Sequence, residues 1–463
     1  MRVCASNTVV IYKFGGRRPR FNKNKQKHGE NKMDLKPTKP LSGFIELLPA
    51  QQRCFDECAR RMLAVLRNCG FSQLDLPAIE RAEVLTDKDN WDEIETQIFL
   101  FQKGDTKMGL RYDGTVGLSR FVAGHLNDLT FPFRASQFSK RYRGERAQRG
   151  RYREFYQMDM DIMGINSLST NYDAEIISVI GRVLGSVREF IGDCFVRIGS
   201  RPFWDALFDW LELTPEQKKA VFVLIDKKDK MAPAEFVAGI ADTVMDAKKE
   251  KVILDVFENG YTGVSGQYEK LDAAITELNE FMKVLDVMGV KNARIDLSVT
   301  RGLAYYTGLV FEFGLTDFPE LGTAAGGGRY ADLAGKFSKT KIIGVGAAIG
   351  FSRIFVALME SGKIDLSQFE SNVDVAVLVM GDENLPYAMS VLNDLRDAGV
   401  PSVAYLDTDK KFKNQIEYAD KIMAKFSMII GTDEVKNKLV ALKNMATGDQ
   451  VSVTISDAIK MIK

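Results

Sequence analysis

The side chains best suited to chemistry lie between Arg141 and Asp161, in the segment RYRGERAQRGRYREFYQMDMD. Gly144 and Gly150 bracket a polar stretch, which is typical of a turn between two strands. Alternation along the second strand predicts that one face carries Arg151, Arg153, Phe155, Gln157, Asp159 and Asp161. Such a face could hold phosphates at its cationic end, a flat base in the middle, and an amine or imidazole at its acidic end. The alternative is a solvated basic strand on a nucleic-acid surface, which would not need the carboxylates.

Other candidate residues are scattered along the chain. The segment LRYDGT (110–115) predicts a strand and turn with Asp113 and Thr115 on the same side, although an Asx-type turn explains the same residues. A loop at 302–308 would present Arg301, Tyr305 and Tyr306. The run TAAGGGRY (323–330) permits close backbone approach to a ligand, but a flexible loop has the same composition. Arg353 stands alone in an apolar segment, where a cation is costly unless it is paired or bound to an anion.

The composition narrows the class of protein. A chain of 463 residues with 45% hydrophobic and 27% charged residues predicts several globular domains. A net charge of +1 argues against a wholesale polyanion binder, although it hides local charged patches, and no apolar run is long enough to cross a bilayer. The five cysteines are odd in number and lack paired CxxC spacing, which favours a reducing compartment without a zinc ribbon. His28 and His125 are the only histidines, so metallohydrolase chemistry is not expected.

Periodicity predicts the elements that must position these residues. A basic arm comes first, and it could steer RNA, act as a transit segment, or precede a true start at Met33. The next elements are a helix at 50–68, a strand at 71–79, a hairpin at 134–143 and 151–161, a helix at 171–191 and a strand at 195–198. A mostly helical insertion follows, then two strands within 293–313 and a strand leading into a helix at 343–355. The last ninety or so residues predict a βαβ-type module with a mostly parallel sheet.

Five segments come in the order found in the histidyl-tRNA synthetases: LRYDGT, RGERAQRGRYREFYQMDMD, TRGLAYYTG, AAGGGRY and GAAIGFSRIF. The chain resembles that family from about residue 41 to its end. The resemblance implies an α+β protein: a class II catalytic domain on an antiparallel sheet, a helical insertion, and an α/β anticodon-binding domain. The helix and strand at 50–79 match the family's motif 1, which implies a homodimer. The implied domains are 1–40 (basic extension), 41–199 and 291–360 (catalytic), 200–290 (insertion), 361–372 (linker) and 373–463 (anticodon binding).

The resemblance also implies a reaction. The enzyme would activate L-histidine with ATP, releasing pyrophosphate, and transfer histidine to the terminal adenosine of tRNA(His). Arg143 would grip the α-phosphate, Phe155 would stack on adenine, Glu145 would contact the adenine edge and Arg353 would hold the far phosphates. Arg301 and Arg143 would stabilise developing charge. Mg²⁺ would accompany ATP through ligands that the sequence does not identify, and no haem, flavin, NAD or structural zinc is expected.

The amino-acid site is implied in the same way. Asp113, Thr115 and Gln157 would bind the α-ammonium, while Asp161 and Tyr306 would take the two imidazole nitrogens. Arg151 and Tyr305 would lie nearby, and Arg146 and Gln148 would approach the acceptor end of tRNA. The expected location is the cytoplasm, without a membrane.

Three departures from the family stand near these motifs: Ala304 for a common Asp, Ala147 for a common Pro, and Ser352 for a residue that is often acidic. A regulatory paralogue without catalysis is the nearest rival, but such proteins usually lack the anticodon module and lose the motif 2 arginines. A domain that senses uncharged tRNA would sit beside a kinase domain, for which there is no room. Another class II synthetase is disfavoured by TRGLAYYTG.

Overall fold

The computed structural model describes residues 37–86, 96–300, 306–331, 333–408 and 410–463. The chain forms two compact units, one of Met1–Glu46 with Cys58–Ile364 and one of Leu47–Glu57 with Asp365–Lys463. Helix α1 (Pro49–Asn68), predicted at 50–68, runs from the second unit into the first. No helix among the described residues is long and apolar enough to cross a membrane.

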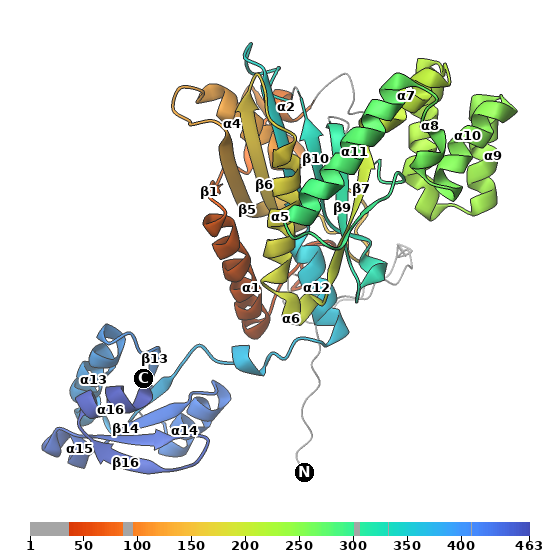
Figure 1. Ribbon diagram of the computed structural model, residues 1–463. Coiled ribbons are helices and arrows are strands. Elements are labelled where there is room, and N and C mark those ends of the chain that lie inside the picture. The colour runs from red at the N-terminus through yellow and green to blue at the C-terminus, as the bar shows by residue number, and fades with distance from the viewer. Residues whose placement is uncertain (1–36, 87–95, 301–305, 332, 409) are drawn as a thin grey trace, which may run out of the picture. The chain divides into compact units, whose positions relative to one another are not determined.

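An eight-stranded sheet is the centre of the first unit (Figure 1). Its strands, in their order across the sheet, are β1 (Ser72–Gln73), β5 (Phe133–Tyr142), β6 (Glu154–Ile165), β11 (Ile342–Ile349), β10 (Thr323–Tyr330), β9 (Tyr306–Leu315), β7 (Cys194–Ser200) and β8 (Ala293–Ile295). Only β1–β5 and β7–β8 pair in parallel. The predicted antiparallel catalytic sheet is therefore confirmed.

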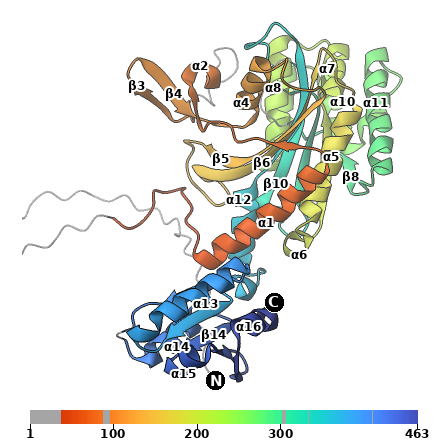
Figure 2. The same ribbon diagram turned by 90° about the vertical axis from the view of Figure 1, so that its left-hand side faces the viewer.

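Helices α5 (Asn171–Gly185) and α12 (Phe351–Ser361) pack on one side of the sheet (Figure 2). Helix α5 packs on β6, β10 and β11, and α12 packs on β6 and β10. On this side of β6, Met158 and Met160 are fully buried. The prediction of one continuous helix at 171–191 is wrong, because Ser186 and Val187 are not helical and separate α5 from α6 (Arg188–Ile191).

A small three-stranded sheet lies at the edge of this unit, in the order β2 (Ile79–Arg81), β4 (Thr106–Leu110) and β3 (Leu100–Lys103). The strand predicted at 71–79 is consequently two short strands in different sheets, β1 and β2. The short helix α2 (Ala82–Leu85) follows β2, and α4 (Thr115–Gly124) follows β4. The turn between β4 and α4 contributes to the candidate site.

The segment after β7 is helical, as its periodicity predicts. The elements are α7 (Arg201–Trp210), α8 (Pro215–Lys227), η1 (Lys228–Lys230), α9 (Pro233–Val244), α10 (Ala247–Glu258), η2 (Tyr261–Val264) and α11 (Glu269–Val287). Thr214 and Gln217 form a capping box at the start of α8. Trp204 is fully buried in the core of this segment, and its indole N–H donates to the Leu297 carbonyl at 2.9 Å.

The second unit contains a five-stranded sheet. The strand order is β13 (Ser402–Tyr405), β12 (Val375–Val379), β14 (Phe426–Ile430), β15 (Val440–Asn444) and β16 (Gln450–Val453). Its helices are η4 (Ser367–Phe369), η5 (Asp382–Asn384), α13 (Leu385–Asp397), α14 (Phe412–Lys421), α15 (Thr432–Asn437) and α16 (Ile455–Ile462). The first three strands are parallel, but β15 and β16 pair antiparallel, so the sheet is mixed where a mostly parallel one was predicted.

Candidate active site

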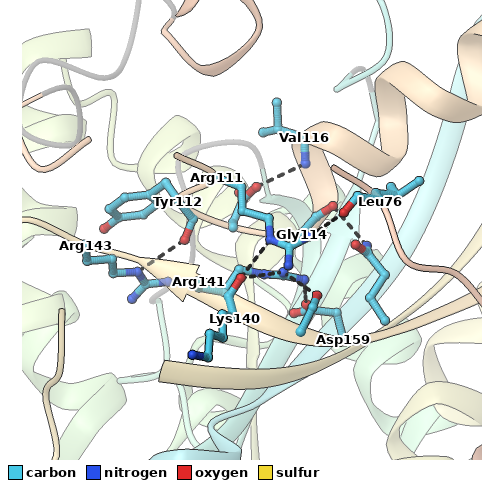
Figure 3. Close-up of polar contacts among 12 residues, drawn as sticks. Leu76, Arg111, Tyr112, Gly114, Val116, Lys140, Arg141, Arg143 and Asp159 are labelled. Atoms are coloured by element: carbon cyan, nitrogen blue, oxygen red, sulfur yellow. Dashed lines mark hydrogen bonds and ion pairs between the residues drawn. The ribbon is translucent and has the colours of Figure 1, made fainter. Parts of the chain in front are cut away.

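The turn between β4 and α4 holds Asp113 at the edge of the site. The predicted strand and turn at 110–115 are confirmed, because β4 ends at Leu110, Gly114 lies in the turn, and Thr115 is the first residue of α4. Asp113 accepts a hydrogen bond from the Val116 N–H at 3.1 Å through Oδ1, as in an Asx-type turn (Figure 3). Its Oδ2 is buried and has no hydrogen-bond partner among the described residues. A buried, open carboxylate oxygen of this kind is suited to binding a cation.

The hairpin of β5 and β6 is confirmed, and its register determines what faces the site. Phe155, Gln157, Asp159 and Asp161 lie opposite Arg141, Ser139, Gln137 and Ala135, respectively. The interpretation of two carboxylates open to a ligand is wrong for Asp159, because its Oδ2 accepts a hydrogen bond from buried Arg141. The predicted strand face also begins too early, since β6 starts at Glu154, after Arg151 and Arg153.

A cavity of about 340 Å³ collects all four residues predicted for ATP. Its predicted lining residues are Arg143, Glu145, Arg151, Phe155, Gln157 and Arg353. The cavity is also lined by Thr323, Ala324, Ala325 and Gly326, from the run predicted to permit close backbone approach to a ligand. The lining residues that sequence reasoning missed are Gln97, Tyr112, Gly150, Tyr152, Ala348 and Gly350. Arg143 from β5's end and Arg353 from α12 thus meet in one cavity, although they are far apart in sequence.

Arg143 and Arg353 of this cavity are held by contacts with neighbouring rings and carbonyl groups. The Arg143 guanidinium lies 4.4 Å from the ring centre of Tyr112 and 5.2 Å from that of Phe155. Its Nε donates to the Tyr112 carbonyl at 3.5 Å (Figure 3). Arg353 donates to the carbonyl of Leu321. Arg143 is therefore placed beside aromatic surface, an arrangement in which a planar cation and a base can share the same rings.

The loop between the two strands carries an internal ion pair and a tight tip. Arg151 donates to Glu145 at 2.9 Å, so the residue expected near histidine contacts the residue expected at the adenine edge. Backbone hydrogen bonds between Gln148 and Arg151 close a two-residue turn, in which Gly150 has a φ of +74°. Arg146 and Gln148 are exposed at this tip. The exposed tip agrees with a role in contacting a macromolecule.

Two glycines of β11 make room for the acidic part of the site. A Cβ at Gly346 would lie 1.9 Å from Oδ1 of Asp161, and one at Gly344 would lie 2.3 Å from the ring of Tyr330. Glycine is therefore required at both positions. The run at 323–330 forms strand β10 and not a loop, so its glycines bring strands and side chains close together.

Asp161 and Tyr330 form a buried hydrogen-bonded pair, in which the Tyr330 hydroxyl donates to Oδ1 of Asp161 at 2.8 Å. Burial, reinforced by the charge of Asp159, raises the pKa of Asp161 well above its usual range, and the bond from Tyr330 opposes this shift. Burial also raises the pKa of Tyr330. Tyr306 lies opposite Tyr330 in the β9–β10 pairing. Sequence reasoning missed Tyr330, although it ends the quoted AAGGGRY motif.

Two further expectations concern residues around α12 and the loop at 302–308. Ser352, which departs from the family, accepts a hydrogen bond from the Tyr156 N–H at 2.8 Å and thereby ties α12 to β6. Arg301, Ala304 and Tyr305 lie outside the described residues. The roles expected for Arg301 and Tyr305 stay predictions, and so do the domain boundaries.

Comparisons with known proteins agree with this arrangement. A family model described as "Histidyl-tRNA synthetase" matches residues 43–355, and one described as "Anticodon binding domain" matches residues 374–463. The chain is 37% identical to the histidine–tRNA ligase of Clostridium tetani, over 93% of this chain and 99% of that protein. It is 36% identical to the ligase of Clostridium acetobutylicum, over 90% and 98%. The crystal structure of histidyl-tRNA synthetase from Nostoc sp. PCC 7120 is similar with a TM-score of 0.78 and 30% identity, over 92% of this chain and 99% of that one.

Proposed function

The chain belongs to the histidyl-tRNA synthetase family and is an enzyme that ligates histidine to tRNA, and we propose that the cavity beside Arg143 binds ATP while the buried acids next to it bind histidine. The observation that carries this proposal is the shared cavity. Arg143, Phe155 and Arg353 line it together, although they come from three different elements. The described part of the chain thus supplies the guanidinium groups of Arg143 and Arg353, besides that of Arg151, and the ring of Phe155 to one volume.

The ATP part of the proposal rests on these two cations and the ring. Adenine stacks on Phe155, Arg143 contacts the α-phosphate and Arg353 contacts the far phosphates. ATP enters as its magnesium complex, in which the metal ion is part of the substrate. Attack of a carboxylate on phosphorus depends mainly on positioning and on neutralising charge, and fixed guanidinium groups serve both needs. Arg301 is proposed to add a further cation near the reacting groups.

The histidine part rests on the buried carboxylates. The open Oδ2 of Asp113 accepts the α-ammonium, with Thr115 and Gln157 beside it. Asp161, with Tyr330 bound to it and Tyr306 on the next strand, faces the imidazole nitrogens. An imidazole has polar nitrogens on both sides of its ring, so an acid and a phenol together distinguish it from apolar side chains.

The partners of the reaction follow from the same proposal. Arg146 and Gln148 at the exposed loop tip contact the acceptor end of tRNA(His), and the module at 374–463 contacts the anticodon. We propose a homodimer formed through α1 and the strand that follows it, acting in the cytoplasm. Sedimentation equilibrium of the purified protein tests the dimer, since a monomeric mass at micromolar concentration contradicts it.

Histidine-dependent exchange of pyrophosphate into ATP tests the activation step without tRNA. The proposal predicts exchange with histidine and not with proline or threonine. Arg143→Ala is expected to abolish exchange, whereas Arg146→Ala, a matched change in the same loop, is expected to retain exchange and impair tRNA charging. Absence of exchange in the unchanged protein refutes the proposal and favours a regulatory histidine-binding or tRNA-binding role. Equal exchange in both variants refutes the role of Arg143.

A further inference from the structure

A buried ion pair lies beneath the turn that carries Asp113. Arg141 of β5 is fully buried, and Asp159 of β6 is only 3% exposed. The Arg141 guanidinium donates to Oδ2 of Asp159, to the Ser139 hydroxyl at 2.8 Å and to the Lys140 carbonyl at 3.2 Å (Figure 3). Three acceptors from two strands therefore fix the position of this cation.

The backbone of the turn rests directly on this pair. A Cβ at Gly114 would lie 2.4 Å from Nη2 of Arg141 and 2.6 Å from Oδ2 of Asp159. Gln137 of β5 holds the same residue from the side, since its amide donates to the Gly114 carbonyl at 3.1 Å. Only glycine fits between the ion pair and the turn, so a displacement of the pair would move the turn.

Asp113 precedes this glycine and carries the open oxygen of the site. Its Oδ1 is used by the Val116 N–H, which leaves Oδ2 directed to a group that the described residues do not provide. Burial raises the pKa of Asp113, the hydrogen bond from the Val116 N–H and the positive charge of Arg141 lower it, and the negative charge of Asp159 raises it. The pair thus acts on both the position and the charge of this carboxylate.

We propose that the Arg141–Asp159 pair is a positioning element that sets Asp113 for the α-ammonium of the substrate. This inference rests on the proposed function, since it assumes that histidine occupies the site. The pair itself does not touch the amino acid. It supports Gly114 from below and so fixes the turn, and an ammonium ion then meets an oriented carboxylate at Asp113.

Removing both charges tests the proposal with the fold preserved. Breaking one half of a buried ion pair leaves an uncompensated charge, whereas replacing both partners by apolar residues of similar volume is often tolerated. The variant Arg141→Met/Asp159→Leu is therefore compared with the unchanged protein by circular dichroism, thermal unfolding and pyrophosphate exchange. The KM for histidine is expected to rise about 10- to 100-fold, the effect of losing one charge-assisted hydrogen bond, while the KM for ATP changes less than about threefold.

Analogues separate positioning from general damage. Histidinol keeps the amine, whereas imidazolepropionate lacks it, and both are measured as competitors of histidine. The proposal predicts that the double variant weakens histidinol binding as much as histidine binding, and leaves imidazolepropionate within about twofold. Equal weakening of all three ligands indicates a purely structural pair and overturns the proposal, as does unchanged affinity for all three.

A conservative variant keeps the test decisive if the double variant does not fold. Asp159→Asn preserves shape and hydrogen bonding but leaves the charge of Arg141 uncompensated. We therefore expect this variant to lose affinity for histidine and histidinol, which carry an amine, and to keep its affinity for imidazolepropionate. Unchanged histidinol binding in this variant contradicts the proposal. Pyrophosphate exchange by the unchanged protein distinguishes failure of the proposed function from failure of the positioning role. If the unchanged protein shows no exchange, the proposed function fails. If it shows exchange and the variants are unaffected, only the positioning role is refuted.

Discussion

Replacing Tyr330 by phenylalanine should damage histidine recognition while leaving ATP binding intact. The hydroxyl of Tyr330 donates to Asp161 at 2.8 Å, and both side chains are only 1% exposed. The substitution removes one oxygen atom and leaves the ring in place over Gly344. No other described hydrogen bond to Asp161 can take over, so its carboxylate loses its donor inside the protein.

The size of the effect follows from the burial of the pair. A buried hydrogen bond to a charged group contributes roughly 1.5–3 kcal/mol, which corresponds to a loss of about 10- to 150-fold in kcat/KM for histidine. The bond from Tyr330 lowers the pKa of Asp161, so its removal raises that pKa further. Because the ionised carboxylate is the form that pairs with an imidazole N–H, the acid limb of the activity profile should move to higher pH.

The assay is pyrophosphate exchange at several histidine concentrations across the pH range in which the protein stays folded. Tyr387→Phe is the matched control, since this hydroxyl donates to the Leu439 carbonyl at 3.1 Å in the other unit. The control should lose only about 0.5–1.5 kcal/mol of stability and keep the unchanged profile. An identical pH profile and an identical KM for histidine in Tyr330→Phe would show that Asp161 does not act through this bond.

Three further changes probe other parts of the molecule. Phe155→Ala should raise the KM for ATP about 5- to 150-fold in exchange assays, since stacking on a base contributes about 1–3 kcal/mol; an unchanged KM contradicts the stacking role. Gly346→Ala should cost about 1–3 kcal/mol in urea unfolding and weaken histidine binding, because the new Cβ would overlap Asp161; full stability would show that the strands can separate there. Trp204→Ala should lower the free energy of unfolding by about 3–5 kcal/mol, as expected for a fully buried Trp, and a smaller loss would indicate that the helical segment collapses around the gap.

The parts of the fold that the sequence predicts well are those with strong local signals. Helix α1 follows from apolar residues at intervals of three and four, and the start of α8 follows from the capping residues Thr214 and Gln217. The hairpin follows from alternation and from the glycines at its turn. In each case the residues that decide the conformation are neighbours along the chain, so no knowledge of distant contacts is needed.

The parts that the sequence predicts poorly depend on contacts between distant residues. The glycines of β10 have a composition that a flexible loop shares, yet they form a strand that lies close to β11, where a Cβ at Gly327 would be 2.1 Å from the Gly346 carbonyl oxygen. Arg141 and Asp159 are charged residues on two neighbouring strands, and nothing in the local sequence marks them as a pair. Only the register of β5 against β6 brings them together. The ATP residues could be grouped through resemblance, whereas Gln97 and Tyr112 required the folded cavity.

The buried acids also explain how the site can reject other amino acids. The negative charges of Asp113 and Asp159 act on Asp161, and Asp159 forms an ion pair with the buried Arg141. Burial raises the pKa of Asp113 and of Asp161, so both are held in an environment that favours a proton or a bound cation. An ammonium at Asp113 and an imidazole N–H at Asp161 relieve this cost together. A ligand with an apolar side chain meets only the first carboxylate and leaves Asp161 with the Tyr330 hydroxyl as its one described donor, a penalty of about 1–3 kcal/mol. Selectivity thus comes from polar groups that the folded protein buries and cannot satisfy alone.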